Sequence, residues 1–160
     1  PDERAKRSRE TFLTHRAESI IVAVLATVTG LVTTGANVNR GRTSKRAVTV
    51  ANALDVNLGG DEFIQDLSQT LQDWELTVTI DSYTKSPTAQ IDTQLNKIRE
   101  EVTVALNANY TQGLAYVLNT AEGDAGAPEV SGEGEQASGG QRMAWKFRYR
   151  RSRTNPGAQP

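Results

Sequence analysis

The sequence contains no cysteine in its 160 residues and only one histidine, His15. Without cysteine there are no disulfide bonds, thiolate metal ligands or cysteine nucleophiles. A catalytic triad built on histidine would have to use His15, which lies among charged residues in the first predicted helix. The remaining carboxylates show no catalytic or metal-binding spacing. We therefore predict that the protein is not an enzyme and uses no metal or cofactor.

Long apolar runs are also absent. The longest, residues 20–28, covers nine positions, whereas a membrane-spanning helix needs about 20. Basic residues precede this run, as in a secretory signal peptide, but Glu10 and Glu18 lie beside it and no small-residue cleavage site follows. We expect a soluble, non-secreted protein with no membrane partner.

Hydrophobic residues are scarce in three segments, 2–9, 122–141 and 152–160, which lower the overall hydrophobic fraction to 37%. The rest has the composition and length of one globular domain. We predict a basic N-terminal extension at 1–10, a single α+β domain at 11–152 and a disordered C-terminal tail at 153–160.

The net charge of −1 conceals a strong polarity along the chain. Residues 1–16 hold five basic and three acidic groups, residues 17–140 hold seven basic and 16 acidic, and residues 141–160 hold six basic and none acidic. Two interpretations stay open. The basic ends are solvated tails that keep the protein in solution, or they form an electrostatic footprint for a phosphate backbone or an acidic protein.

Apolar periodicity predicts two helices. The first runs from residue 8 or 11 to residue 29, with Gly30 as its stop. A strand competes for 20–28, which is rich in Ile and Val, but the length of the periodic segment favours a helix. The second begins at Ser86 and Pro87, with Ser86 as N-cap, and ends near 107–109. Its buried face comprises Ile91, Leu95, Ile98, Val102, Ala105 and Leu106.

Alternating patterns predict the strands. They are expected at 36–43, 48–58, 74–81, 114–120 and 141–152, with a bulge near Asn52 and an end at Gly59, Gly60 and Asp61 for the second. Residues 121–140 have no periodicity and are predicted to be an exposed acidic loop. The fold class is therefore α+β: a mixed or antiparallel sheet of about four to five strands packed against two helices, with a long acidic loop before the last strand.

Basic residues recur on the first and last predicted strands. In the last strand they alternate with Trp145, Phe147 and Tyr149, so the aromatic side chains face the core and do not form a base-stacking platform with them. Two basic rows on neighbouring strands would repel each other unless acidic groups, for example from another subunit, lie between or across from them, which favours assembly. We therefore predict a basic subunit-facing or DNA-facing surface made of Arg40, Arg42, Lys45, Arg46, Lys146, Arg148, Arg150 and Arg151.

The element order and three short motifs resemble the tail terminator proteins of long-tailed phages, of the lambda type. Residues 54–62 resemble the apolar strand of that family that ends in G-x-E/D, and residues 147–151 resemble its Tyr/Arg closing strand. The resemblance covers residues 10–152. The family's T-G-A-x-V-x-x-G-R-like strand is matched by Thr34, Gly35, Ala36, Val38, Gly41 and Arg42.

The resemblance implies a structural role in the virion, at the head–tail junction. Such proteins assemble in the host cytoplasm into a ring, typically a homohexamer, at the head-proximal end of the tail, where they terminate tail tube polymerisation and present a head-joining surface. The implied partners are further copies of the chain, the tail tube protein, a head-completion or neck protein, and DNA passing through the lumen. The predicted basic surface would then face a subunit, the tube or DNA. Two alternatives remain: a head-completion or neck ring protein, and a nucleic-acid-binding module that uses the basic termini.

Overall fold

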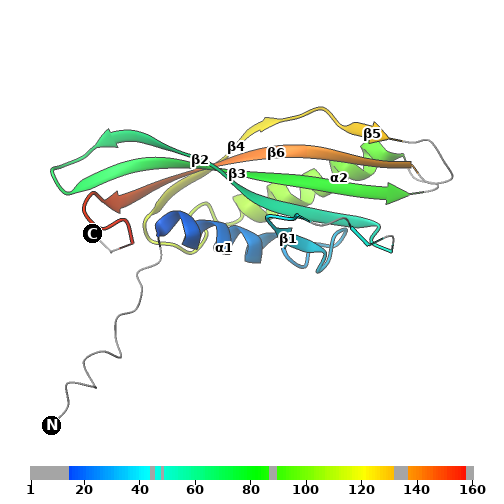
Figure 1. The fold of residues 1–160 in the computed structure, drawn as a ribbon, viewed down its shortest axis with the longest axis horizontal. Coiled ribbons are helices and arrows are strands. Elements are labelled where there is room, and N and C mark those ends of the chain that lie inside the picture. The colour runs from blue at the N-terminus through cyan, green and yellow to red at the C-terminus, as the bar shows by residue number, and fades with distance from the viewer. Residues whose placement is uncertain (1–14, 44–45, 48, 87–89, 132–136, 158–160) are drawn as a thin grey trace, which may run out of the picture.

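The computed structural model describes residues 15–43, 46–47, 49–86, 90–131 and 137–157. Within these residues the chain forms two helices and a six-stranded mixed sheet, which confirms the predicted α+β class (Figure 1). The helices are α1 (Arg16–Val28) and α2 (Ile91–Asn107). The strands are β1 (Val38–Arg40), β2 (Asn52–Asp66), β3 (Leu71–Ser86), β4 (Val117–Ala125), β5 (Glu129–Ser131) and β6 (Ala137–Ser152).

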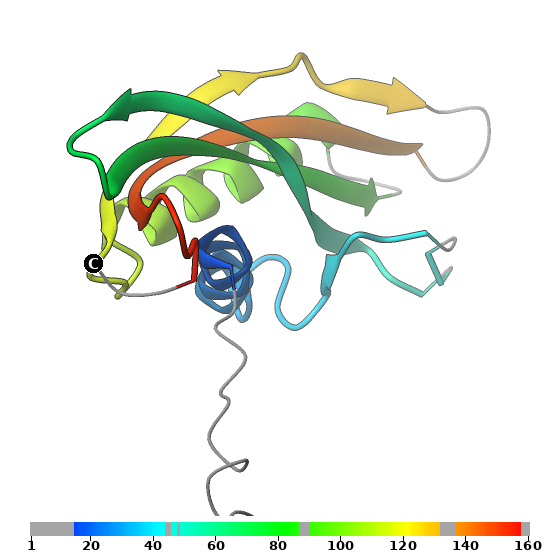
Figure 2. The same cartoon turned by 60° about the vertical axis from the view of Figure 1, so that its left-hand side comes forward.

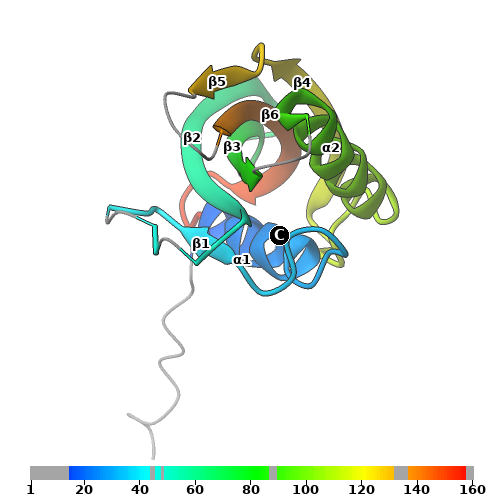
Figure 3. The same cartoon turned by 90° about the vertical axis from the view of Figure 1, so that its right-hand side faces the viewer.

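The strand order in the sheet is β1-β2-β3-β6-β4, and β5 follows β4 along the same edge of β6. The β1–β2 pair is parallel and all other pairs are antiparallel. The sheet is strongly curved, and both helices lie on its concave side (Figures 2 and 3). The two sheet faces therefore meet different surroundings. We call the helix-covered face the inner face and the opposite one the outer face.

Residue alternation assigns the side chains to these two faces. From Leu76 to Thr84 in β3 and from Gly139 to Tyr149 in β6 every second residue is buried, while the intervening residues are mostly polar or charged, as expected for an antiparallel sheet covered on one side only. The predicted aromatic row of β6 belongs to the core. The buried cluster includes Ile20, Ile21 and Val24 of α1, Ile98 and Val102 of α2, Leu76, Val78 and Ile80 of β3, and Met143, Trp145, Phe147 and Tyr149 of β6.

The motif at 31–42 comprises the turn between α1 and β1 and β1 itself. Gly30 and Gly35 have φ of 87° and 55°, which favour glycine, and their backbones are joined by a 2.8 Å hydrogen bond from Gly30 N to Gly35 O. Thr33 donates to Glu101 of α2 from its backbone N (2.9 Å) and from its hydroxyl (2.6 Å). The turn thus fixes β1 relative to both helices.

The prediction that the second strand ends at Gly59, Gly60 and Asp61 is wrong. β2 continues to Asp66, and the pairing with β3 shifts register between Leu58 and Asp61. A Cβ atom on Gly59 would lie 2.7 Å from the carbonyl oxygen of Thr77, so the glycine permits the close approach of the two strands. Glycine inside a strand often marks such a bulge, and here it does.

The predicted loop at 121–140 is also largely strand. β4 extends to Ala125, β5 occupies Glu129–Ser131 and β6 begins at Ala137; residues 132–136 lie outside the described part. β4 and β5 are mostly exposed and rich in small or acidic side chains, so they lack the apolar alternation that predicts a strand. Backbone pairing with β6 supplies the order instead.

The boundaries of other elements also differ from those predicted. The first strand is shorter than 36–43, and the third is longer than 74–81 at both ends. Ser86 is the last residue of β3, paired with Ala137, and is not the N-cap of α2; that position belongs to Gln90, and Pro87 is not among the described residues. The pairing with β6 therefore outweighs the local capping signal.

At the ends of the chain, residues 1–14 and 158–160 are outside the structure as described, which leaves the predicted extension at 1–10 without a structural account. Part of the predicted tail is described, and the backbone N of Arg153 donates to the carbonyl oxygen of Thr70 at 2.9 Å. Neither described helix is long and apolar enough to cross a membrane.

Candidate interaction surfaces

The predicted basic residues do not form one surface. Their two strands, β1 and β6, are separated in the sheet by β2 and β3. Arg40 of β1 faces the helices and forms a two-pronged ion pair with Glu18 of α1, with 2.7 Å between Nη2 and Oε2. Hydrogen bonding to Arg40 lowers the pKa of Glu18. Arg42 follows β1, and Lys45 is not among the described residues.

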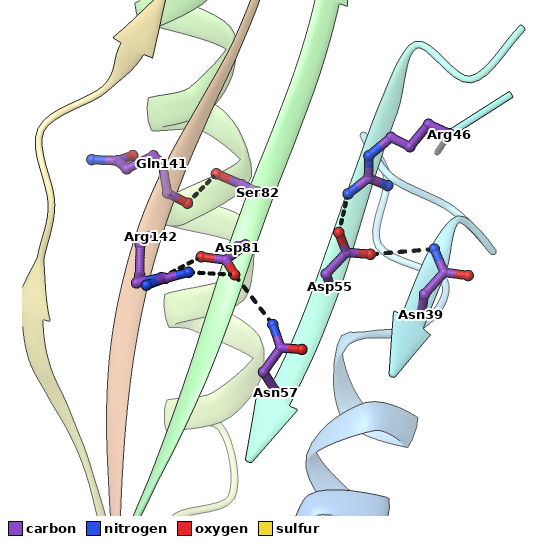
Figure 4. A network of polar contacts seen from close by, with 8 residues as sticks. All are labelled: Asn39, Arg46, Asp55, Asn57, Asp81, Ser82, Gln141 and Arg142. Carbon is purple, nitrogen blue, oxygen red and sulfur yellow. Dashed lines mark hydrogen bonds and ion pairs between the residues drawn. The ribbon is translucent and has the colours of Figure 1, made fainter. Parts of the chain in front are cut away.

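Arg46 lies on the outer face above β2 (Figure 4). Its guanidinium contacts the Asp55 carboxylate and is 4.8 Å from the ring centroid of Tyr83. Asp55 also accepts a 3.4 Å hydrogen bond from Asn39. Burial lowers the pKa of Arg46, and Asp55 partly opposes this effect. With 14% side-chain exposure, Arg46 is a packed residue that ties the β1–β2 connection to the sheet.

Lys146, Arg148 and Arg150 do come together, on the outer face of β6. Arg142, which was not among the predicted residues, extends the line. We call these four residues the basic row. Each contacts a carboxylate of the neighbouring strand β3: Arg142 contacts Asp81 (2.7 Å), Lys146 contacts Glu75 (2.9 Å), and Arg148 and Arg150 contact Asp73 (3.6 and 3.0 Å). The acidic groups that compensate the row therefore come from the same chain.

The basic side chains are more exposed to solvent than their acidic partners. Side-chain exposure is 68% for Arg142 against 29% for Asp81, and 50% for Lys146 against 25% for Glu75. Arg148 and Arg150 are exposed by 41% and 36%, while Asp73 beneath them is exposed by 2%. The outermost layer of this face is consequently basic even though its charges are nearly balanced.

Asp73 anchors one end of the row. Its carboxylate accepts hydrogen bonds from Arg150 Nε (3.0 Å) and Gln65 Nε2 (3.2 Å) and lies near Arg148. Burial alone would raise the pKa of Asp73, but the hydrogen bonds from Arg150 and Gln65 and the positive charges of Arg150 and Arg148 outweigh burial, and the pKa is lowered. The carboxylate therefore stays ionised and holds two arginines in place.

Arg151, the last of the predicted residues, lies on the inner face. Its guanidinium is 3.6 Å from the ring centroid of Trp74 and 3.8 Å from the Asp61 carboxylate, and its Nη1 is 3.0 Å from Nε2 of His15. Tyr149 donates a 2.7 Å hydrogen bond to Asp61, and burial, followed by this bond, raises the pKa of Tyr149. This cluster closes the core beside the start of α1 and contributes nothing to the outer face.

Sequence reasoning missed a second surface, the tip of the β2–β3 hairpin. We call residues 58–70 the arm; it forms the left-hand end of the sheet in Figure 1. β1 pairs with β2 only at Leu54, Asp55 and Val56, so among the described strands only β3 pairs with the second half of β2. The whole of 58–66 is exposed. Its edge is open for pairing with another chain.

The arm combines apolar and acidic side chains. Exposed fractions are 50% for Leu58, 45% for Phe63, 38% for Ile64 and 41% for Leu67. The arm also carries Asp61, Glu62 and Asp66, and the sequence has no lysine or arginine between residues 47 and 84. The signal that could have revealed this surface is the pairing requirement of residues 71–76, which need a partner strand on the other side of the turn.

Among the residues that the structure describes, no group of three or more His, Asp and Glu side chains is arranged to hold a metal ion. Compared with protein-family models and with curated protein sequences, the chain matches none.

Proposed function

We propose that this chain is a structural protein of a long-tailed phage: a tail terminator that forms a ring at the head-proximal end of the tail, stops tail tube polymerisation and presents the surface for head joining. It would act by assembly and without catalysis. Its partners would be further copies of the chain, the tail tube protein and a neck protein, and its location the head–tail junction of the virion.

The arm is the observation that carries the proposal. An open strand edge that exposes four large apolar side chains is costly for an isolated domain and useful for one that pairs with other chains. The sequence resemblance at 31–42 supplies the specific family. In the structure this stretch positions β1 through Gly35 and Gly41, both at positive φ, so substitution of either glycine by another residue would strain the turn.

The balanced outer face disfavours the alternative of a nucleic-acid-binding module as far as that module would use the C-terminal bases of β6; residues 1–14, the other basic end, lie outside the described part. The four bases of the basic row lie over three carboxylates, those of Asp73, Glu75 and Asp81. Binding to a phosphate backbone draws on net positive charge, and this face has little of it.

The proposal is tested by adding the purified chain to polymerising tail tubes and measuring tube length by negative-stain imaging. A terminator caps one end of each tube with a ring and shortens the length distribution. Tubes of unchanged length without rings would contradict the proposal. A ring that binds completed heads and ignores tubes would identify a head-completion or neck protein instead.

A further inference from the structure

The arm and the basic row are complementary surfaces on one chain. Among the described residues no cation lies within ion-pair distance of Glu62 or Asp66 of the arm. Asp66 accepts a 2.9 Å hydrogen bond from Gln72, whereas Glu62 lies on the outer face, in register with Glu75 and Arg148. The basic row, in contrast, has its charged ends outermost and its carboxylates beneath. The arm therefore offers the outer-face carboxylate of Glu62 together with exposed apolar side chains, and the row offers exposed cations.

The two surfaces cannot meet within one chain. Glu62 is paired across the sheet with Glu75, which is paired in turn with Arg148. β3 therefore always lies between Glu62 and the row, at a separation of two strand spacings, about 10 Å. The charge of Glu62 reaches the row of its own chain only at a distance, where it contributes to raising the pKa of Lys146, and direct contact of the arm with a basic row needs a second molecule.

Pairing of two arms with each other is disfavoured. It would bring Asp61, Glu62 and Asp66 of one copy against the same residues of the other, and like charges placed opposite each other destabilise a sheet. The two register shifts in the arm, at Leu58/Asp61 and Phe63/Gln65, also distort its edge. The arm is thus protected from self-pairing but open to a basic partner.

The row is better suited to a protein carboxylate than to a nucleic acid. Its four bases exceed its three β3 carboxylates by a single charge, and Glu62, Asp124 and Glu129 contribute to raising the pKa values of Lys146 and Arg142, so the field beyond the screening length of about 8–10 Å is small. At contact distance the cations matter most, because a partner contacts the exposed ends of Arg142 and Lys146 before it contacts Asp81 or Glu75.

We infer that the arm of one copy packs on the basic row of a second copy, with Glu62, which the strand register places on the outer face, meeting the exposed cations and with Ile64 and Leu67 covering the outer face around Ala144. The inference rests on the proposed ring and names the contact that builds it. Because the surfaces differ, the contact is repeatable from copy to copy, and a repeated head-to-tail contact forms a ring when the rotation between copies closes.

Two charge reversals test the contact through self-association, measured by native mass spectrometry and sedimentation of the whole chain. Glu62→Lys reverses the arm, and Lys146→Glu reverses the row. Each variant alone is expected to associate at least about tenfold more weakly, because it places like charges together. Mixed in equal amounts, the two variants are expected to regain association. The arm of the Glu62→Lys copy then meets the row of the Lys146→Glu copy, with opposite charges. The unaltered arm of the Lys146→Glu copy meets the unaltered row of the Glu62→Lys copy.

The matched control is Glu100→Lys, the same charge change at an exposed position of α2. This helix covers the inner face of the sheet, opposite to the basic row (Figures 2 and 3). It is expected to associate like the unaltered chain. Thermal melting of each variant checks that it is folded. If Lys146→Glu fails to fold because Glu75 loses its partner, Lys146→Gln gives the weaker but same-signed loss.

The outcomes separate the contact from the proposed function. Association that none of the reversals weakens, or that the mixture fails to restore, overturns the arm–row contact while leaving the terminator proposal to its tube assay. A chain that is monomeric at every concentration overturns the contact as well. Salt-sensitive binding of duplex DNA that Lys146→Glu abolishes, without self-association, overturns it in favour of a nucleic-acid surface.

Discussion

The two halves of β2 differ in both burial and strand pairing. In the first half, residues 52–57, the strand lies between β1 and β3, and Ala53, Leu54 and Val56 are fully buried. In the second half, residues 58–66, it pairs with β3 alone and every residue is exposed. The first half stabilises the fold. The second contributes few buried contacts and is free to serve binding.

Substitution of two isoleucines should give the largest difference in the free energy of unfolding. Ile80 of β3 is paired with Val56 in the buried half and is fully buried, whereas Ile64 lies in the arm with 38% exposure. Ile80→Ala should lower the free energy of unfolding by about 2–5 kcal/mol, because it removes buried apolar volume and leaves a cavity. Ile64→Ala should change it by less than about 0.5 kcal/mol. Urea denaturation of both variants measures the contrast, and equal losses would contradict the division of the strand.

Asp73 should have the next largest effect. Asp73→Asn removes the charge that holds Arg148, Arg150 and Gln65 on the outer face, and we expect a loss of about 2–3 kcal/mol in stability at pH 7. Asp66→Asn, the same change at an exposed arm carboxylate, is the control and should be close to neutral. The comparison is again made by urea denaturation, and a neutral Asp73→Asn would show that the row does not depend on its buried acid.

The contribution of Asp73 should also appear in the pH dependence of stability. Because the pKa of Asp73 is lower in the folded protein than in the unfolded chain, the unfolded state binds its proton first as the pH falls. The stabilisation is present above the unfolded value, about 3.9, and is lost as the pH falls through the lower folded value. Melting temperatures between pH 6 and 2 should fall less steeply for Asp73→Asn than for the unaltered chain. Parallel curves would contradict this assignment.

The bulge between the two halves should give the smallest of these effects. Gly59→Ala places a methyl group 2.7 Å from the Thr77 carbonyl oxygen, and we expect a cost of about 1–3 kcal/mol from the resulting overpacking. Gly60→Ala is a natural control, since its added Cβ has no neighbour within 4 Å among the described atoms. If the two variants melt at the same temperature, the close approach at Gly59 does not matter.

Sequence patterns predicted the elements whose side chains alternate strongly. The aromatic residues of β6 and the apolar positions of α2 identified the core because burial selects residue type at fixed spacing. The arm was not predicted, because exposed strand residues need not be apolar and because Gly59 and Gly60 resemble a strand end. β5 was missed for the same reason, since its order comes from pairing with β6.

The candidate surface was predicted only in part. Lys146, Arg148 and Arg150 could be placed together because alternation puts them on one face of one strand. Arg151 follows Arg150 directly and therefore points to the opposite face. The position of Arg40 depends on the strand order, which separates β1 from β6 by two strands, and no local pattern in the sequence encodes that order.

Disulfide trapping tests the contact between the arm and the basic row most directly. The chain has no cysteine of its own, so Leu67→Cys in the arm and Ala144→Cys, between Arg142 and Lys146 of the row, provide the only thiols. Within one chain these positions are far apart, because residue 144 pairs with Thr79 while the arm turn adjoins the Leu71–Ser152 pair. We expect covalent oligomers after mild oxidation of the double variant, resolved on a non-reducing gel. Only monomers, or the same yield from the control pair Leu67→Cys with Val104→Cys, would contradict it.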